Sequence, residues 1–457
     1  MSAPPPAAET GAVASARPGP AHGPDPAKVR AAVRGGTLAY FVDQFDIYLP
    51  IVVLAPATAY FQAANLSAST TALLSSLVFA STLIGRPLGA VIFGHFADTV
   101  GRKRTTLVAV GGFGVLTLAT ACLPGHETIG MWSVGLLIAL RFIDGVFLGG
   151  EYTTAVPLAM EWSPKHKRGL YASVITSTSP AAYAVIAAIT LLMLELLPSA
   201  GLHSAYVQWG WRVPFLIGAL LAAVLFRYYL KQVHEPPVEL TGEKHKVPLV
   251  RLLVKYPKAL AQVFVLMTGT WLATNMEAAV TPVQLKEHLL LSSQQVTLTM
   301  LVINAAAALS YPLFGLLSQR IGRRRFYIGY GIAVIVLGAG SYTLLMVSGG
   351  GFGAALGWGV LIGVFTVGTF GPIAAYLTER FPSSIRSTAY GVGYSLALIA
   401  PAFYQFYLQQ LDNVVAPHLA PALLIVLAGV LIGLGGFLGP ETKDVDMADD
   451  RTIPKLS

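Results

Sequence analysis

Charged residues are scarce in this chain of 457 residues, at 11% of the total, whereas 54% of the residues are hydrophobic. Soluble proteins carry charge on about a quarter of their residues, so the composition excludes a large soluble domain. Long polar segments are lacking as well, because apolar runs of about 20 residues recur along nearly the whole chain. Each run is long enough to cross a hydrocarbon core of about 30 Å, so a lipid bilayer is the expected surrounding.

Metal ligands and catalytic signatures are also missing. Cys122 is the single cysteine, and no histidines and cysteines have the spacing of a metal site. We therefore expect no metal and no cofactor. An enzyme and an ATP-driven pump are not expected either, because the sequence lacks a nucleophile signature and a P-loop. The net charge of +8 lies in short loops rather than on one continuous face, which argues against nucleic acid as a partner.

Hydropathy predicts an all-α membrane protein with twelve transmembrane helices. They are expected at 37–61, 71–93, 105–123, 131–161, 169–197, 213–230, 259–280, 296–317, 326–347, 356–377, 389–411 and 420–438. The chain is expected to divide into a disordered tail (1–34), a six-helix bundle (35–230), a central linker (231–257), a second six-helix bundle (258–439) and a tail (440–457).

Lysine and arginine gather in alternate loops, and basic loops resist translocation. The basic loops include Arg102 to Arg104, Lys165 to Arg168 and Arg323 to Arg325. Both termini and the central linker are therefore predicted to be cytoplasmic, in a multi-pass protein of the inner membrane.

Two sequence patterns occur twice. Gly94-His-Phe-Ala-Asp98-Thr-Val-Gly101-Arg-Lys-Arg104 reappears as Gly315-Leu-Leu-Ser-Gln319-Arg-Ile-Gly322-Arg-Arg-Arg325, at an offset of 221 (315 − 94). Glu161-Trp-Ser-Pro164-Lys-His-Lys-Arg168 reappears as Glu379-Arg-Phe-Pro382-Ser-Ser-Ile-Arg386, at an offset of 218 (379 − 161). Two repeats at nearly one offset indicate that the halves arose by duplication, as in many secondary transporters.

These motifs resemble those of the major facilitator superfamily over nearly the whole chain. The block from Gly94 to Arg104 is similar to the signature loop of that superfamily. Segments Arg141 to Glu151, Trp209 to Phe215 and Pro440 to Lys443 resemble its sugar-porter and metabolite:proton symporter branches. Asp43-Gln-Phe-Asp46 resembles the paired-aspartate motif of aromatic-acid, sialate and short monocarboxylate proton symporters. The resemblance implies two pseudo-symmetric six-helix bundles that alternate access to a central site.

The repeated loops predict a gate at the cytoplasmic helix ends. Glycine permits a tight turn, and an aspartate at a helix end can pair with nearby basic groups. The alternative is a role in topology and folding alone. Gln319 replaces the aspartate in the second copy, so a matching charge latch is not expected there. The predicted gating residues are Gly94, Asp98, Gly101, Arg102, Arg104, Glu161, Arg168, Glu379 and Arg386.

Acidic residues inside apolar spans are the candidates for proton coupling, because an ionised carboxylate in a membrane is costly unless it is paired or hydrated. Asp43 and Asp46 lie on one face of the first helix, and Asp144 and Glu151 share a face of the fourth. Asp46 is the first candidate, followed by Asp43, Asp144 and Glu151. The competing interpretation is a structural ion pair or a helix cap.

Arg141 is the predicted substrate-binding residue, because its planar fork can hold a carboxylate with two parallel hydrogen bonds. Arg141 could instead only neutralise Asp144 or an aspartate of the first helix. Gly145, Gly149 and Gly150 are expected to let a neighbouring helix approach closely. Arg86 is expected to snorkel or to pair near the cytoplasmic helix end. In the second half, the residues that could face a substrate are Asn275, Glu277, Tyr376, Tyr404 and Gln405.

The function expected from these features is secondary transport: proton-coupled uptake of a small organic anion by a monomer in the lipid bilayer. The alternatives are a sugar or polyol facilitator and a drug:proton antiporter. The Gly-Pro motif that such antiporters carry in the fifth helix is absent, since this chain has Ser179-Pro180 there. A solute sensor is disfavoured, because the linker and the tail are too short for an output domain.

Overall fold

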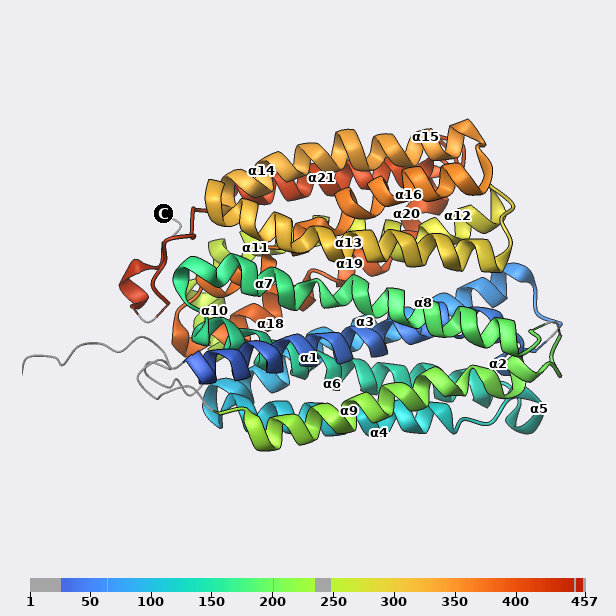
Figure 1. The fold of residues 1–457 in the computed structure, drawn as a ribbon, viewed down its shortest axis with the longest axis horizontal. Helices are drawn as coiled ribbons and strands as arrows, with labels where there is room; N and C mark the ends of the chain where they lie inside the picture. The colour runs from blue at the N-terminus through green and yellow to red at the C-terminus, as the bar shows by residue number, and fades with distance from the viewer. Residues whose placement is uncertain (1–25, 64, 200, 235–247, 448, 455–457) are drawn as a thin grey trace, which may run out of the picture.

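A computed structural model describes residues 26–63, 65–199, 201–234, 248–447 and 449–454. This part of the chain is helical and contains no strand. Its helices run roughly parallel along the long axis of the molecule (Figure 1). Residues 1–25, most of the predicted N-terminal tail, and residues 235–247 of the predicted linker lie outside the described residues.

The helices of the first half follow the predicted spans closely. Their bounds are α1 Pro26–Val52, η1 Ala55–Ala57, α2 Thr58–Phe61, α3 Ala68–Thr99, α4 Arg102–Ala121, α5 His126–Ile129, α6 Trp132–Trp162, η2 Lys165–Lys167, α7 Arg168–Thr176, α8 Thr178–Leu196, η3 Tyr206–Gly210 and α9 Arg212–Gln232. Gly101 forms the turn between α3 and α4. Its φ is 126°, a backbone conformation that residues other than glycine rarely adopt.

The second half repeats this plan. Its elements are α10 Pro248–Lys255, α11 Pro257–Asn275, η5 Met276–Val280, α12 Thr281–Glu287, α13 Ser293–Ile321, α14 Arg323–Ala333, η6 Val334–Ala339, α15 Gly340–Ser348, α16 Gly351–Val367, η7 Gly368–Phe370, α17 Ile373–Glu379, η8 Ser383–Ile385, α18 Arg386–Leu396, α19 Ile399–Ala402, α20 Tyr404–Leu411, α21 Ala420–Leu438 and η9 Asp450–Thr452. Gly322, with φ 98°, takes the place of Gly101 between α13 and α14.

Among the described residues, ten helices are long and apolar enough to cross a membrane, and α1 with the bent η1–α2 segment makes an eleventh. The remaining span, 386–411, is the eleventh in chain order and is broken into α18, α19 and α20. Side chains of α11 bind the carbonyls near this break: Trp271 Nε1 donates to Tyr394 O at 2.9 Å and Asn275 Nδ2 donates to Pro401 O at 2.9 Å. A broken helix is tolerated inside a membrane protein where such partners satisfy the freed backbone.

Helical or buried structure is found in three segments that were predicted as tails or as the linker, and for residues 26–34 it contradicts the predicted disorder. Residues 26–34, assigned to a disordered tail, form the start of α1, where Val29 and Ala32 are buried. Part of the predicted linker forms α10, whose Leu252 is also buried. Residues 442–447 of the predicted C-terminal tail pack on the bundle through Thr442, Val445 and Met447. In each case a few side chains are buried against the bundle, and averaging hydropathy over a long window does not detect such short segments.

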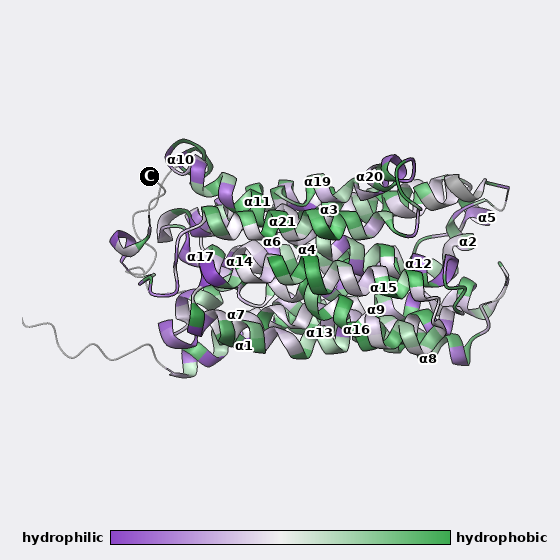
Figure 2. Ribbon diagram, turned by 90° about the horizontal axis from the view of Figure 1, so that it is seen from above, coloured by the Kyte–Doolittle hydropathy of each residue, from purple (hydrophilic) through white to green (hydrophobic). Residues whose placement is uncertain are grey.

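The two halves meet along paired helices, α8 with α13 and α3 with α18. Figure 1 shows α7 and α8 beside α13, between the two groups of helices. Figure 2 shows hydrophilic residues gathered near α17 and the C-terminus, whereas the helix flanks are largely hydrophobic. We call this hydrophilic end, where α3, α6 and α17 finish, the latch end, and the end with α5 and α12 the far end.

Candidate functional site

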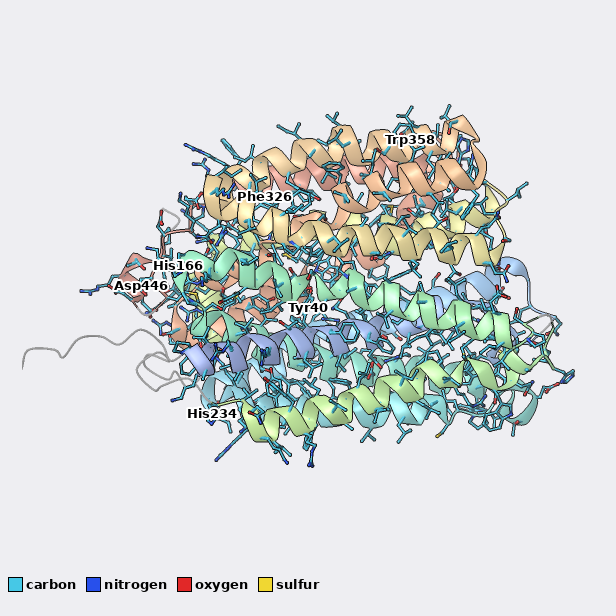
Figure 3. All side chains as sticks on the ribbon, viewed as in Figure 1. Tyr40, His166, His234, Phe326, Trp358 and Asp446 are labelled. Carbon is cyan, nitrogen blue, oxygen red and sulfur yellow. The ribbon has the colours of Figure 1, made fainter. Side chains whose placement is uncertain are left out.

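A small cavity lies between the halves, with a volume of about 10 Å³. Tyr40, on α1, is one of its lining residues and is labelled in Figure 3. The cavity is lined by Tyr40, Gln44, Tyr48, Ser179, Pro180, Trp271, Thr274, Glu277, Asn304, Tyr311, Val367 and Phe370. Residues of α1 and α8 face residues of the second half, so a solute held here would contact both halves.

Five aromatic rings and one charged side chain line the described part of this cavity. The charged residue is Glu277, which is 2% exposed and accepts a hydrogen bond from Asn304 Nδ2 at 3.0 Å. Glu277 is the predicted substrate residue that the structure places directly at the cavity. An unpaired carboxylate surrounded by aromatic rings costs less as the neutral acid, or when it faces a cation.

A chain of hydrogen bonds leads from the cavity to a buried ion pair. Ser179 Oγ donates to Gln44 Oε1 at 2.7 Å, and Gln44 Nε2 donates to Asp43 Oδ2 at 2.7 Å. Asp43 in turn binds Arg86 at 3.2 Å, and both side chains are fully buried. Of the two alternatives expected for Arg86, snorkelling or pairing near the cytoplasmic helix end, the structure shows pairing, but with a buried acid well inside α3.

The Arg86 guanidinium has spare hydrogen-bonding capacity. Its carbon lies 4.5 Å from the centre of the Tyr152 ring, and its Nε and Nη1 have no partner among the described residues. Glu151, next to Tyr152 in the sequence of α6, interacts electrostatically with Asp43 and Arg86, and both of its carboxylate oxygens lack hydrogen bonds within the same part of the chain. Arg86 thus pairs directly with Asp43, whereas Glu151 lies near both charges without an ion pair or hydrogen bond among the described residues.

A second cluster of the same composition lies inside the first half. Arg141 Nη2 binds Asp46 Oδ2 at 2.5 Å and also contacts Asp144. Thr117 Oγ1 donates to Asp46 Oδ1 at 2.5 Å. Asp43 and Asp46, predicted to share one face, therefore turn to two different arginines. Arg141 is already held by two carboxylates and does not line the described cavity.

The other predicted substrate residues lie elsewhere. Asn275 caps the broken helix as described above, and Tyr376 accepts a hydrogen bond from Gln262 Nε2 at 3.1 Å. Tyr404 lines a different cavity, of about 180 Å³, whose lining also includes Pro50 and Ala279. Gln405 is exposed. Asn275 and Tyr376 are therefore explained by helix packing, because each forms a hydrogen bond with a buried group of another helix.

Aromatic residues close the cavity toward the latch end. The hydroxyls of Tyr40 and Tyr394, one from each half, are 2.6 Å apart. The Tyr394 ring lies 4.8 Å from the Tyr152 ring and 5.0 Å from the Trp271 ring. These contacts join α1 and α6 to α11 and α18, so separation of the halves here would require them to break.

The predicted gating residues form a latch across the halves. Asp98 accepts hydrogen bonds from Thr388 N at 2.9 Å and Thr388 Oγ1 at 2.7 Å. The second copy uses a neutral counterpart, because Gln319 Oε1 accepts from Gly169 N at 3.0 Å. Gly94 allows the close approach, since a Cβ there would lie 3.0 Å from the Thr388 backbone.

Two pseudo-symmetric ion clusters complete the latch. Glu161 contacts Arg102 of its own half and binds Arg386 of the other half at 2.7 Å. Glu379 binds Arg323 of its own half at 3.3 Å and Arg168 of the other half at 3.4 Å. Arg104, by contrast, is exposed on the surface. Eight of the predicted gating residues therefore lie at the interface or at the turns that form it, and Arg104 does not.

The C-terminal segment ties the latch together. Arg168 Nη1 donates to Val445 O at 3.1 Å, Arg386 Nη2 donates to Met447 O at 3.1 Å, and Thr442 Oγ1 donates to Glu379 at 2.7 Å. Residues 442–447 thus contact groups from both halves of the bundle.

Sequence reasoning missed several cavity residues, namely Gln44, Tyr48, Ser179, Trp271, Asn304 and Tyr311. A signal existed on α1, where Tyr40, Gln44 and Tyr48 recur every four residues and share one helical face. Trp271 and Tyr311 carried no comparable signal, because aromatic residues are common in apolar spans. No cluster of metal-binding side chains occurs among the residues that the structure describes.

Comparison with known proteins identifies the family. The sequence profile of the Major Facilitator Superfamily matches residues 36–404. The inner membrane metabolite transport protein YhjE of Escherichia coli (strain K12) is 32% identical over 392 residues, covering 82% of this chain and 85% of that protein. The shikimate transporter of the same strain is 27% identical, covering 89% and 93%, and its proline/betaine transporter is 25% identical, covering 90% and 84%.

The fold is similar to that of a solved proton:xylose symporter, XylE, with a TM-score of 0.74 at 17% sequence identity, covering 92% of this chain and 98% of that one. At this identity the likeness establishes the fold, two six-helix bundles with twelve membrane spans. The chain therefore belongs to the Major Facilitator Superfamily, as a multi-pass membrane transporter of metabolites rather than an enzyme.

Proposed function

We propose that this protein is a proton-coupled symporter that takes up a small organic acid by alternating access. The observation that carries the proposal is the pair of buried clusters, Asp46–Arg141–Asp144 and Asp43–Arg86–Glu151, each with two acids and one arginine. Such a cluster carries one surplus negative charge when it is fully ionised. Binding one proton neutralises it, which lowers the cost of keeping it in the membrane interior.

The geometry favours different roles for the two arginines. Arg141 is bound by two carboxylates, so we assign its cluster to proton coupling with Asp46 as the first proton acceptor. Arg86 has two unpartnered nitrogens among the described residues and is connected to the cavity through Asp43 and Gln44. We therefore move the carboxylate-binding role predicted for Arg141 to Arg86, whose fork suits a carboxylate.

Uptake into proteoliposomes tests the function. Radiolabelled shikimate, short monocarboxylates, a sialic acid, xylose, proline and betaine would be supplied with and without an inward proton gradient. An organic acid should accumulate against its own gradient only when the proton gradient is present. Uptake of a sugar alone, to the external concentration and unaffected by the proton gradient, would instead identify a facilitator.

A zwitterionic substrate is the second candidate, and Glu277 favours it. A carboxylate among aromatic side chains at the cavity suits a cationic ammonium group. The similarity to a proline/betaine transporter agrees with this alternative. In the same assay, Glu277→Gln should strongly weaken uptake of a zwitterion, whereas it should leave uptake of a simple monocarboxylate largely intact.

We also propose that the latch end faces the cytoplasm of an inner-membrane monomer. The basic residues around Arg102, Lys165 and Arg323 lie at this end, because they follow the ends of α3, α6 and α13, which is the arrangement expected of loops that resist translocation. Exposed Lys165 and Glu127 can each be replaced by cysteine in a Cys122→Ser background. An impermeant thiol reagent should label Glu127→Cys in intact cells and leave Lys165→Cys unlabelled, and the reverse pattern would invert the topology.

A further inference from the structure

A basic cavity opens at the latch end, away from the transport site. It has a volume of about 600 Å³ and lies where α10 meets the start of α11, beside α17 and the C-terminal segment. Figure 1 shows α10 at this end, close to α18. The lining consists of Arg251, Val254, Lys255, Tyr256, Pro257, Lys258, Ala259, Arg380 and Pro454, four of which are cations. Within the described part of the chain, no acidic residue lines it.

Arg380 is buried in this cavity without a counter-charge among the described residues. The residue is 1% exposed, and its recorded partners are neutral: Gln262 Oε1 at 3.3 Å and Pro454 O at 3.4 Å. Its Nη2 has no hydrogen-bond partner within the same part of the chain. Burial lowers the pKa of the Arg380 guanidinium, as expected for a cation that lacks an anion. Such a group is stabilised when an anion binds beside it.

Arg251 shows the same incomplete pairing. Its Nη1 donates to Ser384 Oγ at 3.1 Å, and its Nε is buried without a partner among the described residues. Two arginines from different segments thus line one cavity, and each has a buried N–H group without a hydrogen-bond partner among the described residues. This differs from the latch, where Arg102, Arg323 and Arg386 all bind glutamates.

The start of α11 adds a third source of positive potential. This helix has 19 residues and begins at Pro257, so the backbone N–H groups of Lys258 and Ala259 belong to its first turn. First-turn N–H groups have no acceptor within their own helix and favour anions. A helix N-terminus together with arginine and lysine side chains is a common arrangement for holding a phosphate group.

We propose that this cavity binds the phosphate group of an acidic phospholipid from the adjoining leaflet. The cations and the α11 N-terminus would hold the phosphate. The apolar side chains of α10 favour a lipid as its source, because Val250, Leu253 and Val254 are 55%, 51% and 72% exposed beside the cavity. An amphipathic helix with this pattern lies at the membrane interface with its apolar residues toward the acyl chains.

Lipid-dependent thermal unfolding of the purified full chain tests the proposal. Phosphatidylglycerol or phosphatidylcholine with identical acyl chains would be titrated into detergent-solubilised protein. Phosphatidylglycerol should raise the unfolding midpoint at concentrations where phosphatidylcholine does not. The pocket variant combines Arg251→Gln, Lys255→Gln and Lys258→Gln, and should need roughly a hundredfold more phosphatidylglycerol, since each cation contributes about fivefold in affinity.

A matched control separates the site from general attraction between charges. Lys165→Gln, Lys167→Gln and Arg325→Gln remove the same charge from exposed positions at the latch end, and this variant should respond like the wild type. Equal responses of the pocket and control variants would overturn the proposal. A shift produced by millimolar inorganic phosphate without lipid, and lost in the pocket variant, would overturn the lipid source and assign the site to a soluble phosphate.

Discussion

At the scale of single residues, Gln44 links the cavity to the buried charges. Its amide accepts from Ser179 and donates to Asp43, so one side chain connects the solute space to the Asp43–Arg86 pair. The spacing of Tyr40, Gln44 and Tyr48 could have placed this glutamine on the cavity face, but its link to the buried charges was not predictable, because that link depends on α8 and α3 packing against α1. The acids themselves were predictable, since charge is rare in apolar spans.

Gln44→Leu should raise the KM for substrate roughly tenfold with a smaller change in kcat. The variant loses two hydrogen bonds, each contributing about 0.5 to 1.5 kcal/mol, and isolates Asp43 from the cavity. Initial rates of proton-driven uptake over a range of substrate concentrations measure the effect. Ser179→Ala removes only the first bond and should give a smaller increase in KM. An unchanged KM in Gln44→Leu would place substrate binding outside this cavity.

Glu277 gives a second residue-scale test, on folding. It is buried and accepts a hydrogen bond from Asn304 at 3.0 Å, which a glutamine oxygen can accept equally well. Glu277→Gln should therefore retain the thermal stability of the wild type, as measured by the unfolding midpoint in detergent. Glu277→Ala leaves the Asn304 amide with one partner fewer and should cost about 1 to 3 kcal/mol. A marked loss of stability in Glu277→Gln would show that the ionised acid is part of the fold.

At the scale of elements, the close approach of α3 and α6 depends on glycine, as predicted for Gly145, Gly149 and Gly150. A Cβ on Gly149 would collide with the Arg86 carbonyl, and one on Gly145 with the Thr82 carbonyl. Lipid is as apolar as the helix surfaces, so the hydrophobic effect does not drive helices together inside a membrane. Small residues promote their association because they let the backbones come into close van der Waals contact. The same packing positions Arg86 beneath Tyr152.

Gly149→Val should lower the unfolding free energy by at least about 2 kcal/mol. The added side chain would collide with the backbone of Arg86, which cannot move aside as a flexible side chain could. Gly135→Val is the matched control, since it lies on the same helix α6 and a Cβ there meets nothing within 4 Å. Thermal unfolding in detergent compares the two. Equal stability of the variants would mean that the α3–α6 contact does not limit the fold.

Predictability also differs between elements. Spans such as Met131 to Glu161 were located closely, because a continuous apolar run in a membrane has few alternatives to a helix. The break at 397–398 in the eleventh span was not, because it is compensated by Trp271 and Asn275 from another helix. The start of α1 at Pro26 and the helix α10 were missed for a similar reason, since tertiary contacts decide them.

At the scale of the whole molecule, contacts between the two halves close the latch end, and the cavity between the halves is small. Asp98 is linked to Thr388 and Arg102, and Gln319 is linked to Gly169 and Arg323. The two halves thus have a hydrogen-bond acceptor at the same place, which is a charged aspartate in the first half and a neutral glutamine in the second. Ligands and protons can shift such an equilibrium only through their different affinities for the open and closed states.

Asp98→Asn should lower the maximal transport rate several-fold while changing the KM by less than about twofold. The amide retains an acceptor for Thr388 but loses the charge interaction with Arg102, and the residue lies far along α3 from the cavity. Uptake kinetics measure both constants. Gln319→Ala tests the neutral copy and should have the smaller effect on rate. A rate equal to that of the wild type in Asp98→Asn would reduce the residue to a role in folding.

The proposed coupling joins these scales, and Asp46→Asn tests it most directly. The amide cannot exchange a proton, while Arg141 keeps Asp144 as a partner, so folding and solute binding should persist. In proteoliposomes, exchange of internal for external substrate should continue at a rate near that of the wild type, whereas accumulation driven by a proton gradient should fall at least about tenfold. Full gradient-driven accumulation in Asp46→Asn would contradict the assignment and move the proton site to the Asp43–Arg86–Glu151 cluster.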